Sequence, residues 1–402
     1  MKKLYEKNSY LKENITVVTE CVENNKEIFI SLEETIFFPE EGGQYADTGT
    51  IYVIGNNKEE VGILLAEEKD FSAEKSDLRA CDSMERSAID IVRVLDGQLE
   101  GKDNILYKVD KKIPVGSRVR CVLDYDFRYE KMQNHSGEHI LTGVIHNTYG
   151  YTNKGFHLGN EGAITLDVSN PMTYEEVMEM EKRANEIIYL NLPIRDSYPT
   201  EEELKNIEYR SKIEIDGQIR LITIGTEDNI IDICACCAPH VGRTGEVGII
   251  KVTDVVNWKG GVRIFMVAGR RALEYINNEH NIIRKLKEVL STSPENFPEL
   301  VGSYVKELSE IKFKLNKQYE NNIVERLERE IEAYAKAGAE NTESKELNKN
   351  HFEFVATDFP SASMKNIYNI LVEKFSGFVA FLQGMMKMDI DIWQEIKPVN
   401  LS

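Results

Sequence analysis

Two pairs of potential metal ligands, which lie about a hundred residues apart, constrain the fold of this chain more than any other feature. His135 and His139 are four residues apart in a segment with helical periodicity, so their imidazoles share one helix face. Cys236 and His240 have the same separation, in a stretch that Pro239 keeps from forming a regular helix. Three nitrogen donors and one sulfur donor form a set that tetrahedral Zn²⁺ prefers. We therefore expect one zinc ion per chain, held by these four residues, and a fold that brings the helix and the distant loop together.

Cysteine usage supports a metal site. The chain has 6 cysteines in 402 residues, too few for a disulfide scaffold, and three of them fall within four positions. Such crowding suits metal binding or redox chemistry in a reducing compartment. Cys236 is the favoured ligand, because Cys234 ends a predicted strand and Cys237 adjoins Cys236 too closely to share its metal easily. The alternative is that these histidines and cysteines belong to a buried core.

The length and charge of the chain limit its organisation and partners. At 402 residues it exceeds what one hydrophobic core usually supports, so two or three domains are expected. A net charge of −19 argues against a general nucleic-acid coat, but not against a local basic site such as Arg128 and Lys131. No stretch approaches the roughly 18 apolar residues of a membrane span, and the N-terminal segment is too polar for a signal peptide. We expect a cytoplasmic protein without a membrane partner.

The pattern of apolar residues predicts an α+β fold in four parts. Residues 1–110 contain short alternating runs between Asn, Gly and Asp turns, which predict a small β-barrel-like domain. Residues 111–270 combine two helices with further strands and form the expected zinc-binding domain. Residues 271–345 contain two helical stretches separated by prolines, which predict a helical hairpin or coiled coil. Residues 346–402 contain a strand, a helix and a strand, a short α/β unit.

A glycine-rich segment in the first domain is a second candidate for function. Gly42 and Gly43 allow the backbone to approach a ligand closely or to adopt unusual dihedral angles. Gln44 follows them, and its side chain offers both an amide donor and a carbonyl acceptor. Taken alone, the stretch also fits an ordinary turn between two strands.

Three motifs together carry a resemblance to a known family. The segments FFPEEGGQYADTG, HSGEHIL and CCAPHVGRTGEVG occur in this order within roughly residues 15–270. They resemble the editing domain of alanyl-tRNA synthetase and its free-standing relatives, the AlaX-type alanyl-tRNA editing proteins. No synthetase catalytic domain precedes them, so the free-standing form is the closer match. The family's zinc ligands fall on the two ligand pairs, although Cys237, Ala238 and Pro239 replace the two glycines and the threonine that the synthetases usually have between Cys and His.

The resemblance implies a trans-editing hydrolase that deacylates tRNA(Ala) mischarged with serine or glycine. It implies that Gln44, preceded by Gly43, contacts the substrate or the attacking water, and that Thr35 lines the pocket that senses the serine hydroxyl. Gly42 belongs to the same substrate loop. Further substrate contacts are expected from His157, which also fits a structural role, and from Arg243, a suitable partner for a phosphate or carboxylate of the tRNA end. The resemblance thus implies that Gln44, Thr35 and Gly43 are catalytic residues and that Gly42, Arg243 and His157 bind the substrate.

The C-terminal part resembles the start of a DHHA1 domain. The long helical pair and the strand-helix-strand unit after it match that beginning, which implies tRNA contact or a homodimer through the C-terminal helices. The glycine-rich end of the domain is absent after Gln383-Gly384. The resemblance in this region is therefore partial.

Two other functions fit the same ligands. His135, Glu138 and His139 also match the His-x-x-Glu-His signature of inverted zinc peptidases, in which the glutamate is a general base. Such a peptidase takes a carboxylate as its third ligand, and Glu176 or Glu181 on a predicted helix would supply it. A zinc-stabilised module that binds tRNA without chemistry is the third possibility.

Overall fold

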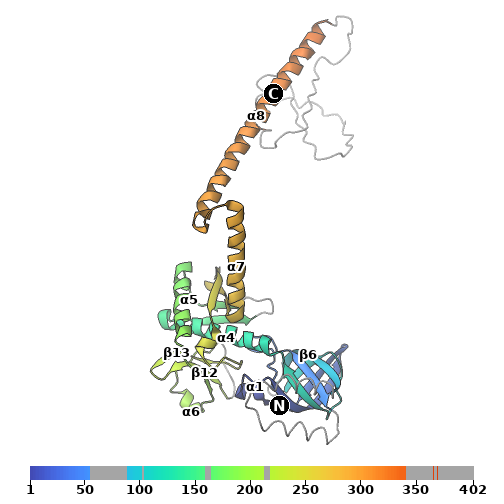
Figure 1. Cartoon of the computed structure of the whole chain (residues 1–402), viewed down its shortest axis with the longest axis vertical. Helices are drawn as coiled ribbons and strands as arrows, with labels where there is room; N and C mark the ends of the chain where they lie inside the picture. The colour runs from blue at the N-terminus through green and yellow to red at the C-terminus, as the bar shows by residue number, and fades with distance from the viewer. Residues whose placement is uncertain are drawn as a thin grey trace, which may run out of the picture. The chain divides into compact units, whose positions relative to one another are not determined.

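The computed structural model describes residues 1–54, 88–101, 104–158, 164–211 and 218–340, together with Lys365 and Asn369. These residues have a mixed α+β architecture that includes a closed six-stranded barrel (Figure 1). The chain divides into two compact units, residues 1–282 and residues 283–402. Apart from Lys365 and Asn369, the expected α/β unit at residues 346–402 lies outside the described residues.

The N-terminal barrel is formed by antiparallel strands in the order β2-β3-β7-β6-β5-β8. Its strands are β2 (Glu13–Asn24), β3 (Glu27–Leu32), β5 (Gly49–Ile54), β6 (Ala88–Glu100), β7 (Asn104–Val109) and β8 (Arg118–Leu123). Along β7 and β8 every second side chain is buried, so a period of two fills the barrel interior. β2 and β3 join at Asn25 and Lys26, whose φ angles of 50° and 69° suit the tight turn of a hairpin.

Short elements precede and flank the barrel. The parallel pair of β1 (Lys2–Lys3) and β4 (Glu34–Thr35) joins the N-terminus to the end of the second barrel strand. Between β1 and β2 lies the single turn α1 (Leu4–Lys7), whose Tyr5 is buried against the barrel core. The chain enters the barrel directly after this turn.

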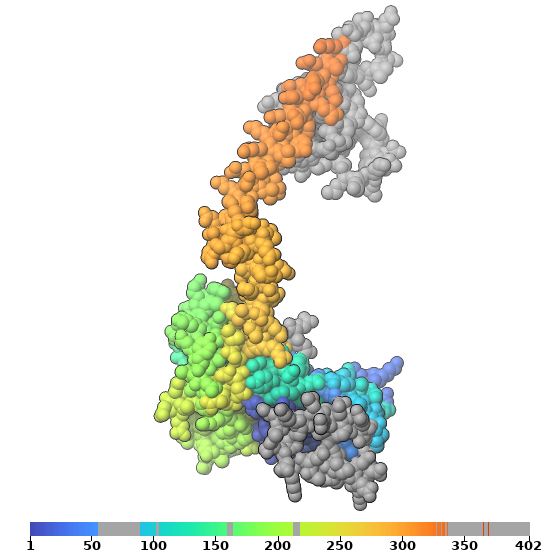
Figure 2. All heavy atoms as spheres, viewed as in Figure 1, coloured from blue at the N-terminus to red at the C-terminus, as the bar shows by residue number. Residues whose placement is uncertain are grey.

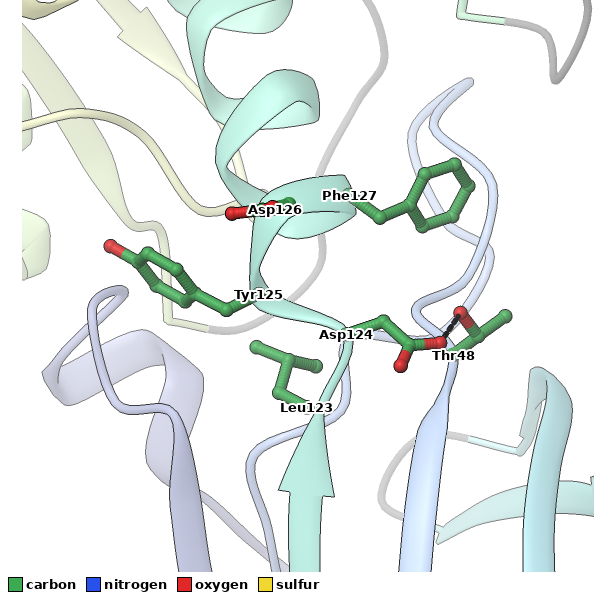
Figure 3. A pocket seen from close by; sticks show the side chains of 6 residues that line it. All are labelled: Thr48, Leu123, Asp124, Tyr125, Asp126 and Phe127. Carbon is green, nitrogen blue, oxygen red and sulfur yellow. Dashed lines mark hydrogen bonds between the residues drawn. The ribbon is translucent and has the colours of Figure 1, made fainter. Parts of the chain in front are cut away.

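The long helix α4 (Tyr125–Tyr149) connects the barrel to the rest of the first unit. Gly150 ends the helix, with a φ of 72° and a hydrogen bond from its N–H to the carbonyl of His146. At its start, the Thr48 hydroxyl donates to Asp124 Oδ2 at 2.6 Å and ties the helix to the barrel (Figure 3). Residues at this junction line a shallow surface hollow: Thr48, Leu123, Asp124, Tyr125, Asp126 and Phe127.

Two further sheets surround α4. One has the order β14-β15-β10-β9 and the other the order β11-β12-β13. Their strands are β9 (Asn153–Leu158), β10 (Ile164–Val168), β11 (Ile194–Ser197), β12 (Leu221–Thr226), β13 (Asn229–Ala235), β14 (Ile250–Trp258) and β15 (Gly261–Ala268). The amphipathic helix α5 (Tyr174–Tyr189) begins with a capping box at Thr173 and buries Val177, Met180, Ala184 and Ile188. The short helices α6 (Glu201–Leu204) and η1 (Thr244–Val247) complete this region.

This arrangement gives the first unit two hydrophobic cores, one inside the barrel and one around α4. Cys236 packs against both cores. In Figure 2 the teal atoms of α4 lie between the blue barrel and the green and yellow residues that follow. The boundary between two cores is a suitable place for a site, because both can position its residues.

Two helices follow the last sheet. α7 (Gly269–Leu290) and α8 (Phe297–Glu340) are separated by the turn η2 (Pro294–Asn296), close to the prolines that predicted an interruption. Their pairing as a hairpin or coiled coil stays a prediction, as do the domain boundaries at residues 110, 270 and 345. The barrel itself continues past residue 110, because β8 is its sixth strand. No helix of the described residues is long and apolar enough to span a membrane.

Candidate metal centre

The structure brings the two predicted ligand pairs together. α4 carries His135 and His139, which are 1% exposed. Cys236 and His240 come from the loop after β13. The four donor atoms, one from each side chain, all lie within 4.8 Å of one another, so they could hold a metal ion. The chemistry of this donor set, one thiol and three imidazoles in a buried position, fits a tetrahedral metal.

The electrostatics of the cluster favour a thiolate. Burial opposes ionisation of Cys236, but the imidazoles of His135 and His240 outweigh this effect and hold the pKa of the thiol well below its usual range. Burial lowers the pKa of His240 to about 3, so its ring is neutral. Burial also opposes charge on His139, but Asp232 and Cys236 raise its pKa to about 9. A thiolate beside imidazoles is the state in which such groups coordinate a metal.

Each of the three imidazoles has an oxygen atom beside its Nδ1. The Nδ1 of His135 lies 2.8 Å from Gln44 Oε1, and the Nδ1 of His240 lies 3.0 Å from Ser136 Oγ. Because a glutamine carbonyl only accepts, His135 must carry its proton on Nδ1, which leaves Nε2 free for a metal. The Nε2 atoms of His135 and His240 face Cys236 Sγ at 3.6 and 3.3 Å.

The oxygen beside His139 belongs to Asp232, which the sequence analysis did not select. Asp232 Oδ2 lies 3.3 Å from His139 Nδ1, and Arg210 donates two hydrogen bonds of 2.7 Å to the same carboxylate. A signal was present in the sequence: Asp232 and Cys234 alternate along β13, and a period of two directs them to one buried face. A charged residue in that buried register indicates a partner inside the protein.

The glycine-glycine-glutamine loop lies against the same cluster. Gln44 is fully buried; its Oε1 accepts from His135, while no hydrogen-bond partner among the described residues satisfies its Nε2. The loop is attached to β9 by a bond of 2.8 Å from the Leu158 N–H to the Gly43 carbonyl. A buried amide nitrogen without a partner is costly in a folded protein, so Gln44 Nε2 is available to a ligand.

Gly43 is required for this docking. Its φ is +84°, and a Cβ atom there would lie 2.4 Å from the carbonyl oxygen of Phe156. Gly116 has a similar φ of +85° but open space around the same position. A comparison of substitutions at Gly43 and Gly116 therefore separates the cost of positive φ from the cost of a clash with a neighbouring atom.

We expect Gly43→Ala to lower the free energy of unfolding by at least about 1 kcal/mol more than Gly116→Ala does. Both changes place a side chain at positive φ, which costs about 1 kcal/mol, but only the first displaces the Phe156 carbonyl. Denaturant unfolding of the two variants measures the difference. Equal losses would mean that the loop does not depend on its contact with β9.

A buried charge cluster holds the residues that follow Gln44. Asp47, Arg128 and Lys131 are at most 1% exposed. Arg128 Nε donates to Asp47 Oδ2 at 2.8 Å, and Lys131 Nζ lies 2.5 Å from Asp47 Oδ1 and 2.9 Å from the carbonyl oxygen of Ala46. The expectation that Arg128 and Lys131 contact phosphate is therefore wrong, because neither side chain reaches solvent.

The other predicted substrate residues lie elsewhere. Thr35 is buried in the barrel, where its hydroxyl lies 2.7 Å from the Tyr107 hydroxyl and accepts the Phe37 N–H at 3.1 Å. His157 on β9 and Arg243 after the metal loop are exposed, and Arg243 donates to the carbonyl of Asn191. Among the described residues, no hydrogen bond joins these three to the metal ligands, so their roles in substrate binding stay predictions.

The carboxylates considered for a peptidase are engaged elsewhere. Glu176 completes the capping box of α5, and Glu181 pairs with Lys251 at 2.9 Å. Glu138 is buried, and Asn153 Nδ2 donates to its Oε1 at 2.5 Å. Glu138 lies beside the four-residue cluster, with its Oε2 3.8 Å from His139 Nε2, whereas neither Glu176 nor Glu181 belongs to that cluster.

Part of the chain is similar to an additional domain of tRNA synthetases. Residues 219–264 match the family described as "Threonyl and Alanyl tRNA synthetase second additional domain", and this segment includes Cys236 and His240. The chain is 28% identical over 336 residues to the alanyl-tRNA editing protein AlaX-L of Pyrococcus horikoshii. The matched region covers 82% of this chain and 71% of that protein. The predicted resemblance to the AlaX-type alanyl-tRNA editing proteins is thereby confirmed.

Alanine–tRNA ligases are similar to a large part of the same chain. Those of Ignicoccus hospitalis and Methanopyrus kandleri are each 28% identical and match 77% of this chain. The matched regions cover 31% and 30% of the two ligases. The chain therefore spans less than a third of these longer relatives.

Proposed function

We propose that this protein is a zinc-dependent trans-editing hydrolase that deacylates mischarged tRNA(Ala), chiefly Ser-tRNA(Ala), with Gly-tRNA(Ala) as a further substrate. The observation that carries the proposal is the buried Gln44 amide: its Oε1 accepts from His135, and its Nε2 has no hydrogen-bond partner in the part of the chain that the structure describes. The similarity to an alanyl-tRNA editing protein supports the choice of substrate. A cytoplasmic location fits such a substrate and belongs to the same proposal.

Zinc is the metal that this ligand set supports best. One thiolate from Cys236 and three imidazoles from His135, His139 and His240 suit it better than the oxygen-rich sites that Mg²⁺ and Ca²⁺ prefer. A bound zinc would supply a Lewis acid close to the ester bond. The hydrogen bond from His135 Nδ1 to Gln44 Oε1 would hold the imidazole ring so that Nε2 is directed at the zinc.

Gln44 would act on the substrate through its amide nitrogen. The hydrogen bond from His135 fixes the side chain, so the two N–H groups on Nε2 have a defined direction. A fixed donor can stabilise negative charge on the ester carbonyl without reorganisation during the reaction. Gly42 and Gly43, both at positive φ, would present the backbone of the same loop to the aminoacyl group.

The decisive experiment measures the deacylation of Ser-, Gly- and Ala-tRNA(Ala) by the metal-loaded protein. We expect hydrolysis of Ser-tRNA(Ala) well above its spontaneous rate and sparing of Ala-tRNA(Ala), since buried polar groups can select a hydroxyl strongly. With zinc in excess, so that the site stays loaded, Gln44→Ala should lower the rate by about 10²–10³-fold. Gln98→Ala, at an exposed position of the barrel, is the matched control and should retain the rate.

Failure of this experiment selects between the alternatives. If Ser-tRNA(Ala) decays only at its spontaneous rate while tRNA is still bound, the protein is a zinc-stabilised tRNA-binding module. Cleavage of peptides would instead support the His-x-x-Glu-His peptidase. The engagement of Glu176 and Glu181 in other contacts argues against that outcome.

A homodimer through the C-terminal helices is also part of the proposal. Along α8, an apolar stripe at spacings of three and four is about half exposed: Val301 45%, Tyr304 51%, Leu308 54%, Ile311 51% and Leu315 47%. Such spacing suits a second helix with the same pattern. Sedimentation analysis of the full chain tests whether two copies associate.

A further inference from the structure

The three metal-ligand histidines differ in what holds their second nitrogen. A neutral amide oxygen lies beside His135 and a neutral hydroxyl beside His240, whereas the carboxylate of Asp232 lies beside His139. The side chains of Asp232 and His139 are 3% and 1% exposed, so solvent does not screen this contact. Of these three histidines, His139 is thus the one with a carboxylate beside its Nδ1.

Asp232 is itself held in a fixed orientation. Arg210 donates from Nε to Oδ1 and from Nη2 to Oδ2, each at 2.7 Å, which is the two-pronged geometry that arginine forms with carboxylates. Arg210 Nη2 also donates to the hydroxyl of Thr142 on α4 at 3.0 Å. The arginine therefore fixes the carboxylate and connects it to the helix that carries His139.

The backbone reinforces this connection. The Arg210 N–H donates to the Ile233 carbonyl at 2.8 Å, and the Ala235 N–H donates to the Arg210 carbonyl at 2.9 Å, just before Cys236. At Gly143 on α4, a Cβ atom would lie 2.9 Å from the Cβ of Asp232, so a glycine permits β13 to approach the helix. Side chain and backbone thus position Asp232 independently.

A second metal is a weaker explanation for these residues. His139, Asp232 and Cys234 also offer donor atoms within 4.8 Å of one another. Both oxygens of Asp232 are bound to Arg210, however, and an arginine beside a carboxylate disfavours a cation at the same place. The contacts therefore fit an orienting role better than a ligand role.

We infer that the Arg210–Asp232 ion pair positions His139 for metal binding: the carboxylate, 3.3 Å from Nδ1, holds the ring so that its other nitrogen is directed at the metal. This inference rests on the proposed metal site. A carboxylate behind a ligand histidine fixes its tautomer and ring orientation and raises its basicity, and loss of such a partner costs about 10–100-fold in metal affinity. Arg210 keeps that carboxylate aligned through its two hydrogen bonds.

The test is the zinc dissociation constant of the full chain, measured by competition with a chromogenic chelator. We expect Asp232→Asn, which keeps the shape but removes the charge, to weaken zinc binding about 10–100-fold. Asp167→Asn is the matched control, because Asp167 is bound by Arg263 through the same two-pronged geometry outside the cluster. It should retain the affinity of the unmodified protein.

Chemical rescue separates positioning from a general structural role. A pocket of about 480 Å³ is lined by Arg210 and Asp232, so a guanidinium ion can enter the space left by Arg210→Ala. We expect this variant to bind zinc more weakly and to recover with guanidinium chloride at concentrations far below those that denature. Arg183→Ala, which removes an exposed arginine of α5, should not respond. If Arg210→Ala does not fold, Arg210→Lys should show an intermediate affinity.

The outcomes that would overturn the inference are specific. They are an unchanged affinity in Asp232→Asn or Arg210→Lys, or a weakened Arg210→Ala that guanidinium does not restore. If the unmodified protein bound no zinc, the proposed metal site would fail first and the inference with it. Because none of these measurements uses tRNA, they remain valid if the proposed substrate is wrong.

Discussion

Cys236→Ser is expected to lower the zinc content of the purified protein well below one ion per chain, since the change removes the thiolate from the proposed ligand set. Cys236 is the only sulfur donor of the four-residue cluster, and nearby His135 and His240 stabilise its thiolate. We expect deacylation to fall at least about 100-fold, because even partners that only orient ligands cost 10–100-fold. Elemental analysis and the rate on Ser-tRNA(Ala) measure the two effects.

Two neighbouring cysteines provide controls for this prediction. Burial raises the pKa of both Cys234 and Cys237, so neither forms a thiolate as readily as Cys236. Cys237→Ser and Cys234→Ser should therefore keep their zinc. Zinc retention by Cys236→Ser, or its loss from Cys237→Ser, would show that the wrong cysteine has been assigned.

Local patterns in the sequence were sufficient to predict many of the helices and strands. The helix with both histidines could be predicted from its periodicity and from Gly150, and the antiparallel strands of the first domain from their alternation. Closure of the barrel was harder to foresee. It depends on β8 pairing with both β2 and β5, and such long-range contacts leave no local pattern.

The ligand pairs of the candidate site were predictable because metal ligands in short motifs keep fixed spacings. The residues that position them were not. Asp232 and Arg210 are 22 positions apart in the sequence, and Arg210 is brought to β13 by an isolated backbone bridge to Cys234 outside the regular strands. In a sequence with 29% charged residues, a buried charge resembles the many charges at the surface. Arg128 and Lys131 were misassigned for this reason.

Thr35 illustrates a different limit. A threonine near a glycine-rich loop suggests a hydroxyl that binds the substrate. A threonine hydroxyl can equally form hydrogen bonds within the protein. Here the hydroxyl is occupied by Tyr107 and by the Phe37 backbone. Only the three-dimensional arrangement of the barrel interior reveals these partners, so the sequence could not decide between the two roles.

The loop with Gln44 depends on the charge cluster behind it, so Asp47→Ala is expected to be strongly destabilising. The change leaves Arg128 and Lys131 buried without their shared anion, and breaking a buried ion pair on one side costs about 3–5 kcal/mol. It also removes the acceptor of the Phe38 N–H, which Asp47 Oδ2 binds at 2.8 Å. Chemical unfolding of the metal-loaded protein measures the loss.

Asp167→Ala is the control that shows how much of the loss in Asp47→Ala is due to the burial of the ion pair. Its partner Arg263 donates bonds of 2.6 and 2.8 Å, but the two side chains are 27% and 19% exposed, so removal should cost about 1 kcal/mol or less. Lys131→Met should cost less than Asp47→Ala, because it removes one of two cations and leaves the Asp47–Arg128 pair intact. A loss in Asp47→Ala no larger than in Asp167→Ala would refute the claim that this cluster fixes the Gln44 loop against α4. With the cluster intact, Ala46 and Gln44 are held to the same helix at Lys131 and His135, one turn apart.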